Sequence, residues 1–544
     1  MPTFKLDDRE IPFEPGDTII QAAHRAGIDI PHYCWHPGLS VAANCRMCLV
    51  EIGPPPGRPP MLLDILRQDP NTGEYILDKK PKLQPACQMR VADGMDVKSE
   101  SSEHVAQARG AVQEMLLLNH PVDCPICDQA GECRLQDYWL EHQGTKKRMR
   151  DELIHMPKAQ VFGPTIVYDA ERCIVCTRCV RFCEEVAKDP VLDVRERGNL
   201  NEIVLSPGRE LDHGYTLMTE FVCPVGALTA IDFRFKARVW FLRSVRSVCQ
   251  GCATGCNAFL DFDPRSETVY RYRPRENLAV NKYWMCDEGM LSYRRAHDDR
   301  FVTAYSGEQE VALEAGVKAA AKALKGVDPE RVGVLLSAQH SNEDNFALLT
   351  LARDYLGSGN LFITGNPAGE GDHVLKHADK NPNTRGVEQL CSTTPPAPLS
   401  ELLVKVGAGA ITHVVGLGSA ASCEVEALSD LKKLILITPF DGPLAGYADV
   451  LLPAATWAES TGTFVNHAGL AQESQRAVKP DRDARPAWKL IAALGRQLGY
   501  AMDWQRLADV RQAMAPDAGA AVADGASATG AAPGGAAGSA GAVQ

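Results

Sequence analysis

The sequence predicts a multidomain protein, in which cysteine-rich α+β domains are followed by an α/β domain. The chain has 544 residues, too many for one hydrophobic core, because domains hold roughly 150 residues each. Of its 18 cysteines, 16 lie between Cys34 and Cys286, and the rest of the chain holds only Cys391 and Cys423. In that second part, short apolar runs alternate with helix-like segments, which is typical of a parallel sheet covered by helices on both faces.

The composition excludes several classes of protein. With 45% hydrophobic and 23% charged residues, the chain is neither fibrous nor wholly disordered. Its net charge of −12 provides no basic face for a nucleic acid. No apolar run approaches the roughly 18 residues of a transmembrane helix, and the N-terminus lacks the features of a signal peptide. We therefore expect a cytosolic protein, in which repeated Cys-x-x-Cys groups bind metal and do not form disulfides.

The first cysteine group consists of Cys34, Cys45, Cys48 and Cys87. Around it the sequence predicts a strand pair at 3–6 and 10–13, a short helix at 18–26 and a strand at 49–52. This order is similar to plant-type ferredoxins, in which three ligands lie in a loop and the fourth comes from a later strand. The first gap is ten residues here and four in those ferredoxins. A 2Fe–2S cluster is therefore favoured, with a structural zinc site as the alternative.

The second group consists of His120, Cys124, Cys127 and Cys133. Three cysteines and a histidine are a standard tetrahedral zinc set, and they also suit a 4Fe–4S cluster with one histidine ligand. The residues alone leave the two possibilities open. In a cluster, a neutral imidazole in place of a thiolate makes the site less negative and eases its reduction.

The third group is the most specific. Residues 173–183 repeat the Cys-x2-Cys-x2-Cys-x3-Cys run of bacterial ferredoxins, and Cys223-Pro224 supplies the Cys-Pro element. Counting back from Cys223, the positions of a second ligand triplet (213, 216 and 219) hold no cysteine, so one cluster is expected. Its predicted ligands are Cys173, Cys176, Cys179 and Cys223. Cys183 would be a buried thiol left without a cluster.

The fourth group follows a predicted strand at 237–242 and opens a new domain. It consists of Cys249, Cys252, Cys256 and Cys286. A zinc ribbon requires two Cys-x-x-Cys pairs, and the gap of three residues before Cys256 fits that pattern less well. A further 4Fe–4S cluster is favoured.

Taken in order, the four groups resemble the large iron–sulfur subunit of the peripheral arm of respiratory complex I, the proton-translocating NADH:quinone oxidoreductase. The resemblance covers roughly residues 1–290. It implies an N-terminal β-grasp 2Fe–2S ferredoxin-like domain and three 4Fe–4S clusters on the other groups, the fourth of which only some bacterial members keep. It also implies a flavin-bearing, NADH-oxidising partner subunit, further peripheral-arm subunits, and a place on the cytoplasmic face of the cell membrane that is reached only through the complex.

The C-terminal half reads as α/β. The sequence predicts strands at 331–336, 361–364, 411–415 and 434–438, with helices at 342–356 and 424–433. The segments 448–453 and 456–469 are similar to molybdopterin oxidoreductases, which implies a shortened, vestigial domain of that fold.

No molybdopterin is expected in this half. No cysteine occurs between Cys286 and Cys391 to bind molybdenum, and Glu288 stands where those enzymes carry a lysine. The run from Gly416 to Ala421 fits G-x-G-x-x-A, but the next strand ends at Thr438 without the acidic residue of a dinucleotide site. We interpret the run as an inherited turn.

Domain boundaries are expected at 1–98, 99–138, 139–240, 241–298 and 299–512. An Ala/Gly-rich tail at 513–544 is predicted to be disordered, and the proline-rich stretch 54–60 is predicted to be a surface loop. The basic cluster of Lys146, Lys147, Arg148 and Arg150 is interpreted as a solvated face or a contact to an acidic neighbouring subunit.

The functional hypothesis is an electron relay, with no catalytic residue and no cofactor ligand beyond the four groups. One rival is an electron-transfer subunit of a soluble NAD-linked hydrogenase or formate dehydrogenase. Formate chemistry would require the missing metal ligand, and an iron hydrogenase would require more cysteine motifs after Cys286. The other rival is a zinc-stapled scaffold without a redox role, which metal analysis distinguishes.

Overall fold

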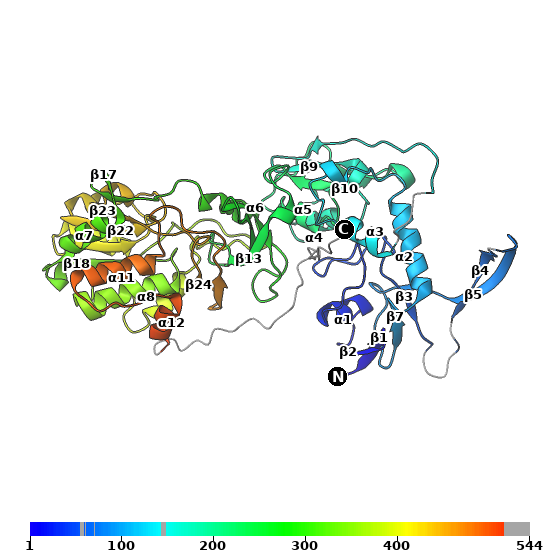
Figure 1. Ribbon diagram of the computed structural model, residues 1–544, viewed down its shortest axis with the longest axis horizontal. Helices are drawn as coiled ribbons and strands as arrows, with labels where there is room; N and C mark the ends of the chain where they lie inside the picture. The colour runs from blue at the N-terminus through cyan, green and yellow to red at the C-terminus, as the bar shows by residue number, and fades with distance from the viewer. Residues whose placement is uncertain (55–58, 60, 70, 143–147, 516–544) are drawn as a thin grey trace, which may run out of the picture. The chain divides into compact units, whose positions relative to one another are not determined.

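The computed structural model describes residues 1–54, 59, 61–69, 71–142 and 148–515. They form two compact units, Met1–Trp240 and the described residues from Phe241 on, and each unit is described by itself (Figure 1). In the described part of the chain, no helix combines the length and the apolar character needed to cross a membrane. The predicted tail beyond residue 515, most of the proline-rich stretch and the Lys146–Lys147 pair lie outside the described residues.

The N-terminal domain is a five-stranded mixed sheet with one helix packed on it. The strands lie in the order β2-β1-β7-β3-β6, in which only β1 and β7 are parallel. Thr18 precedes the helix and its N–H donates to Gln21 Oε1 at 2.9 Å, and Gly27 follows it with a φ of 73°. The predicted β-grasp fold is confirmed. Its elements are β1 (Thr3–Leu6), β2 (Arg9–Pro12), α1 (Ile19–Arg25), β3 (Leu49–Ile52), β6 (Gln84–Pro85) and β7 (Asp96–Lys98).

A separate hairpin lies between β3 and β6 in the sequence. It pairs β4 (Leu62–Gln68) with β5 (Tyr75–Pro81) as a two-stranded sheet of its own. Leu66 and Leu77, which are cross-strand neighbours, are 72% and 68% exposed. The hairpin therefore lies outside the core of this domain, and the sequence pattern did not predict it.

The rest of the first unit holds two helical segments and a small ferredoxin-like domain. In that domain, β12-β9-β8 form an antiparallel sheet, and the hairpin β10–β11 lies between α4 and α5 in the sequence. The elements are α2 (Glu103–Leu116), η1 (Cys124–Ile126), α3 (Arg134–His142), β8 (Gln160–Val161), β9 (Ile166–Tyr168), η2 (Ala170–Arg172), α4 (Arg178–Glu185), β10 (Leu192–Arg195), η3 (Gly198–Leu200), β11 (Glu202–Leu205), α5 (Met218–Val222) and β12 (Leu228–Ala230).

The strand predicted at 237–242 is wrong. This segment forms the 3₁₀ turn η4 (Val239–Phe241), and the strand β13 begins only at Arg243. The reason is a side-chain contact that the apolar pattern does not reveal. Arg238 donates hydrogen bonds to the carbonyls of Pro125 and Cys127, and its guanidinium lies 5.6 Å from the centre of a Trp240 ring.

The second unit opens with a three-stranded antiparallel sheet, β13-β14-β15. A short helix and a 3₁₀ turn follow it. The bounds are β13 (Arg243–Val248), β14 (Asn257–Asp263), β15 (Thr268–Pro274), α6 (Asp287–Leu291) and η5 (Ser292–Ala296).

The larger part of the second unit is an eight-stranded sheet in the order β17-β16-β23-β22-β21-β18-β19-β20. The six strands from β23 to β20 are parallel, and β16 and β17 run antiparallel at one edge. The bounds are β16 (Ala304–Ser306), β17 (Gln309–Val311), α7 (Leu313–Leu324), η6 (Pro329–Arg331), β18 (Val332–Ser337), α8 (Asn342–Thr350), the π-helical turn η7 (Leu351–Leu356), β19 (Leu361–Thr364), α9 (Thr384–Leu390), β20 (Ala397–Pro398), α10 (Leu399–Gly407), β21 (His413–Leu417), η8 (Glu426–Asp430), β22 (Lys433–Thr438), η9 (Ala445–Tyr447), β23 (Val450–Pro453), β24 (Gly462–Val465), β25 (Ala471–Ser474), α11 (Ala487–Leu498) and α12 (Leu507–Met514).

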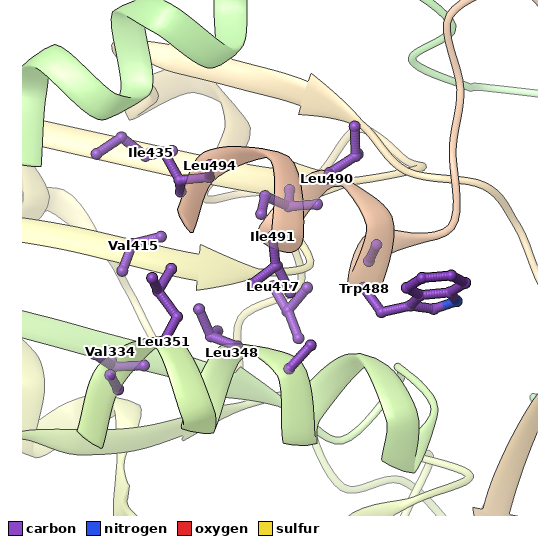
Figure 2. Close-up of a cluster of buried hydrophobic side chains, with 14 of the residues drawn as sticks. Val334, Leu348, Leu351, Val415, Leu417, Ile435, Trp488, Leu490, Ile491 and Leu494 are labelled. Atoms are coloured by element: carbon purple, nitrogen blue, oxygen red, sulfur yellow. The ribbon is translucent and has the colours of Figure 1, made fainter. Parts of the chain in front are cut away.

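Helices cover both faces of this sheet, as the alternation of its strands requires. Along β18, Val334 and Leu336 enter one core, while Leu335 enters the other. Figure 2 shows the first core, where Leu348 of α8 and Ile491 of α11 lie among the strand side chains. The second core is closed by α10 and η8. The predicted α/β domain is confirmed, with a mostly parallel sheet covered on both faces.

Two predicted elements of this domain differ from the structure. The helix predicted at 424–433 is wrong, because only the 3₁₀ turn η8 forms there. Val425 and Leu428, three residues apart as in a 3₁₀ turn, pack into the second core, and Lys433 is already part of β22, where it pairs with His413 of β21. The helix predicted at 342–356 is α8 followed by the π-helical turn η7.

Candidate metal centres

In the first cysteine group, Cys34, Cys48 and Cys87 are buried in the β-grasp domain and Cys45 is half-buried. The sulfurs pair as Cys34 with Cys45 and Cys48 with Cys87. A hydrogen bond from Cys45 lowers the pKa of the Cys34 thiol below its usual value and raises the pKa of Cys45. The Cys34 N–H also points at the Cys45 sulfur, 3.5 Å away. Arg46 follows Cys45 with a φ of 61°, so the loop turns tightly between the second and third thiols.

The second group lies between α2 and α3. Burial lowers the pKa of His120 to about 4, which keeps its imidazole neutral and able to bind a metal at pH 7. Its Nδ1 atom is buried and has no hydrogen-bond partner among the described residues. Burial raises the pKa of the Cys133 thiol to about 12 and also raises that of Cys127. A Cβ atom placed on Gly226 would lie 2.4 Å from the Cys127 sulfur, so this position accommodates only a glycine beside the site.

The third group surrounds a small cavity in the ferredoxin-like domain. The cavity is lined by apolar residues of β9, β11 and β12 and by four thiols, namely Cys173, Cys176, Cys179 and Cys223. Val175 and Thr177 have φ values of 49° and 60°, so the chain turns back around the cavity between the first three thiols. The Val175 N–H donates to the Cys173 sulfur at 3.3 Å.

Cys183 does not line this cavity. It is fully buried on α4, and its sulfur lies 3.5 Å from Nε2 of His213. His213 occupies one of the three positions where a two-cluster ferredoxin would carry its second triplet. A thiol–imidazole pair therefore stands where the second ligand set would begin.

The fourth group lies at one end of the small antiparallel sheet, where Cys249 follows β13 and Cys256 precedes β14, and Cys286 comes from the start of α6. The Gly289 N–H, on α6, donates to the Cys286 sulfur at 3.3 Å, and the Gly251 N–H points at the Cys249 sulfur at 3.5 Å. A Cβ atom on Gly289 would lie 3.0 Å from the Cys249 sulfur and 3.3 Å from that of Cys286. These two thiols are therefore neighbours, although a long segment separates them in the sequence.

Burial raises the pKa of several thiols in the third and fourth groups. It raises the pKa of Cys173 to about 12 and the pKa values of Cys223 and Cys286 to about 11. A buried thiol loses its proton when a cation compensates the charge of the thiolate. The donor sets are therefore suited to iron–sulfur clusters, which are held by thiolates and, in some cases, imidazoles. Among the described residues, no three His, Cys, Asp or Glu side chains form a group that would hold a single metal ion.

The α/β domain contains a cleft of about 390 Å³ at the carboxyl ends of β18, β21 and β22. Both ring nitrogens of His340 are buried there without a hydrogen-bond partner among the described residues. The G-x-G-x-x-A run lies in its wall, where Gly418 has a φ of 76°. The element after this turn is the 3₁₀ turn η8, whereas a dinucleotide fingerprint opens a helix whose N-terminus binds the pyrophosphate.

Sequence reasoning did not single out Arg178 and Arg181, two buried arginines on α4. Their position between Cys176 and Cys183 could have indicated a role, because residues next to buried ligands are often buried and arginine is rarely buried unless it is paired. The basic cluster near residue 148 is partly described, and there Arg148 pairs with Glu114 of α2, with Nε and Oε1 2.7 Å apart.

Family models match four segments of the chain. A 2Fe–2S iron–sulfur cluster binding domain matches residues 1–102, and the NADH-ubiquinone oxidoreductase-G iron–sulfur binding region matches residues 109–148. The ferredoxin-like domain of NADH-quinone oxidoreductase subunit 3 matches residues 163–229. The molybdopterin oxidoreductase model matches residues 321–497.

The chain is similar in sequence to curated proteins that are named as subunits of NADH-quinone oxidoreductase. The G subunit of the NADH-quinone oxidoreductase of Streptomyces coelicolor is 32% identical over 384 residues, which cover 69% of this chain and 42% of the relative. Subunit 3 of the Thermus thermophilus enzyme is 34% identical over 369 residues, 64% of this chain and 46% of the relative. The G subunit of the Rickettsia felis enzyme is 34% identical over 362 residues, which cover 66% of this chain and 50% of the relative. The chain thus spans half or less of the length of these relatives.

A solved structure is also similar in sequence. It is described as the NAD+-reducing [NiFe]-hydrogenase in the H2-reduced state, with 29% identity over 44% of this chain and 91% of that chain. The TM-score of 0.35 is too low to support an argument from the fold.

Proposed function

We propose that this chain, which belongs to the family of the NADH-quinone oxidoreductase G subunit, also named subunit 3, relays electrons through bound iron–sulfur clusters. The observation that carries the proposal is the cavity of the ferredoxin-like domain, where four thiols from two distant segments face one space. No residue in the proposal makes or breaks a bond to a substrate.

The proposed ligand sets are those of the four groups. A 2Fe–2S cluster would be held by Cys34, Cys45, Cys48 and Cys87, and three 4Fe–4S clusters would be held by His120, Cys124, Cys127 and Cys133, by Cys173, Cys176, Cys179 and Cys223, and by Cys249, Cys252, Cys256 and Cys286. When bound, such clusters accept and release single electrons at potentials tuned by ligands, hydrogen bonds and burial.

The chain's own residues supply that tuning. Backbone N–H groups of Val175, Gly251 and Gly289 point at ligand sulfurs and stabilise the charge of the thiolates. His120 contributes a neutral donor in place of a thiolate, which makes the second site less negative. The apolar side chains around the third site exclude water and so strengthen these electrostatic effects.

The assembly is part of the proposal. The relatives are named as subunits of NADH-quinone oxidoreductase. This chain spans half or less of their length, so its place in such an enzyme is our inference. Electrons would arrive from a flavin on an NADH-oxidising partner subunit and leave towards quinone through other subunits. The chain would be attached to the cytoplasmic face of the membrane through that complex.

The α/β domain is proposed to be structural and to bind no molybdenum. No cysteine occurs between Cys286 and Cys391, and Glu288 stands where a lysine would link cluster and pterin. The proposed domain limits remain 1–98, 99–138, 139–240, 241–298 and 299–512. Molybdenum analysis of the purified chain tests this part, with an expected content near zero.

The test of the relay is the iron, acid-labile sulfide and zinc content of the anaerobically purified chain, with EPR spectroscopy after dithionite reduction. The ligand sets predict about 14 iron atoms per chain and overlapping signals from reduced clusters. A content of about ten iron atoms would leave one 4Fe–4S set empty. Two or more zinc ions without any EPR signal would refute the relay and favour a zinc-stapled scaffold.

A further inference from the structure

The helix α4 carries two arginines that are buried beside the third ligand set. Arg178 and Arg181 lie one turn apart and are 5% and 9% exposed. Arginine stays charged in proteins, and a buried charge is costly unless an opposite charge or several hydrogen bonds compensate it. The contacts of these two side chains therefore indicate what they serve.

Arg181 joins the first and third ligand sets directly. Its Nη2 atom donates to the carbonyl oxygen of Cys34 at 2.6 Å and to that of Cys176 at 3.3 Å. Its Nη1 atom donates to the carbonyl of Ser40 in the loop between Cys34 and Cys45. One guanidinium thus holds a proposed 2Fe–2S ligand and a proposed 4Fe–4S ligand by their backbones.

Arg178 makes a second bridge of the same kind. Its Nη1 atom donates to the carbonyl oxygen of Val222 at 3.3 Å, and its Nη2 atom donates to that of Trp35. Val222 precedes the ligand Cys223, and Trp35 follows the ligand Cys34. Both arginines therefore lie between the same two ligand sets.

The loop that carries the first ligands is fixed to this region by neutral and charged contacts as well. Asn44 Nδ2 donates to the Val175 carbonyl at 3.2 Å, and the Ser40 N–H donates to Glu185 Oε2 at 2.8 Å. Among the ion pairs of the described residues, none includes Arg178 or Arg181. All their described hydrogen-bond acceptors are carbonyl oxygens, apart from the Thr177 hydroxyl.

The two buried guanidinium groups have carbonyl hydrogen bonds but no carboxylate partner among the described ion pairs, so nearby negative charge would stabilise them further. Thiolate-ligated clusters on both sides would supply it, because each thiolate brings one negative charge and reduction adds another. A positive charge between two clusters stabilises the reduced form of both, as Coulomb's law requires at short range in a poorly solvated interior.

We propose that Arg178 and Arg181 are positioning residues shared by two clusters. They hold the ligand loop of the 2Fe–2S site against that of the ferredoxin-type 4Fe–4S site, and their charge raises the electron affinity of both clusters. This inference rests on the proposed function, since it requires clusters at both sites.

The experiment is an EPR-monitored redox titration of the full chain and its variants. Arg181→Gln and Arg178→Gln each remove one charge and should lower the electron affinity of both clusters by about tenfold, which is 59 mV for one electron. Arg181→Lys keeps the charge and loses the forked geometry, so its potentials should stay closer to those of the wild type. The control Arg197→Gln removes an exposed arginine that belongs to none of the described ion pairs of the same unit and should leave both potentials unchanged.

Three results would overturn the inference. Glutamine variants that keep their iron and titrate like the wild type would exclude the electrostatic role. A shift confined to one cluster would exclude a shared bridge. Loss of iron from the glutamine and lysine variants alike would indicate that the arginines serve only folding. A wild-type chain without EPR signals would instead refute the proposed function, so the two failures are distinguishable.

Discussion

The choice between Cys183 and Cys223 as the fourth ligand of the ferredoxin-type site gives the sharpest test of the structural reasoning. Cys183 completes a run of four thiols in the sequence, whereas the Cys-Pro element predicts Cys223 as the fourth ligand. In the structure, Cys223 lines the cavity with the other three, whereas Cys183 points to His213. We therefore predict that Cys223→Ser empties the site and that Cys183→Ala leaves it filled.

The expected magnitudes differ for the two variants. Cys223→Ser should lower the iron content from about 14 to about ten atoms per chain, because one 4Fe–4S cluster is lost. Cys183→Ala should keep about 14 iron atoms. Its cost should be a stability loss of about 1 kcal/mol, since a fully buried side chain loses one heavy atom and leaves a small cavity.

The assay is iron and sulfide analysis of both variants, together with EPR spectra at temperatures that separate 2Fe–2S from 4Fe–4S signals. Thermal unfolding of each variant reports the stability change. Cys423→Ala, at an exposed thiol of the α/β domain, controls for the loss of a cysteine as such. The reasoning is refuted if Cys183→Ala loses four iron atoms while Cys223→Ser retains them.

Three further predictions concern charge and burial. Burial lowers the pKa of His340 to about 4, so the protein loses stability as the pH falls from 6.5 towards 4, where the imidazole is protonated only in the unfolded chain. In urea titrations, the wild type should lose about 2.5 kcal/mol more unfolding free energy between pH 7 and pH 4.5 than His340→Gln. The same pH dependence in both proteins would contradict this prediction. Arg300 and Glu459 form a buried pair, 4% and 1% exposed, so Arg300→Met should cost about 3–5 kcal/mol of unfolding free energy; a cost below about 1 kcal/mol would show that the remaining carboxylate finds other partners. His120→Cys adds a thiolate and should lower the electron affinity of the second cluster in a redox titration by about tenfold, whereas an unchanged potential would remove His120 from the ligand set.

Local patterns were sufficient to predict much of the fold. The strand pair at the N-terminus, the helix with Thr18 before it and Gly27 after it, and the strand at 361–364 all appear at or near their predicted positions. Their signals lie within a few residues of one another. The helix predicted at 424–433 failed because tertiary contacts outweigh the local helical pattern: Val425 and Leu428 pack into the second core, and Lys433 pairs with His413.

The cysteine spacings gave the candidate sites for the same reason. In the ferredoxin-like run, three proposed ligands lie within seven residues, and the fourth is marked by a following proline. The hairpin β4–β5 had no comparable signal, because its exposed apolar side chains resemble neither a core strand nor a polar loop. The arginine bridge also had none, since Arg181 and Cys34 are far apart in the sequence.

That bridge also separates a relay from a scaffold on physical grounds. A structural zinc site folds its own loop, and that role does not depend on how close a second metal site lies. Electron tunnelling falls steeply with distance, so a relay requires neighbouring sites to be held close together. Here Arg181 holds the carbonyl of Cys34 and that of Cys176, and no carboxylate neutralises it among the described ion pairs. The contact keeps the two ligand loops close together, which electron transfer between the two sites requires and a purely structural role for each site does not.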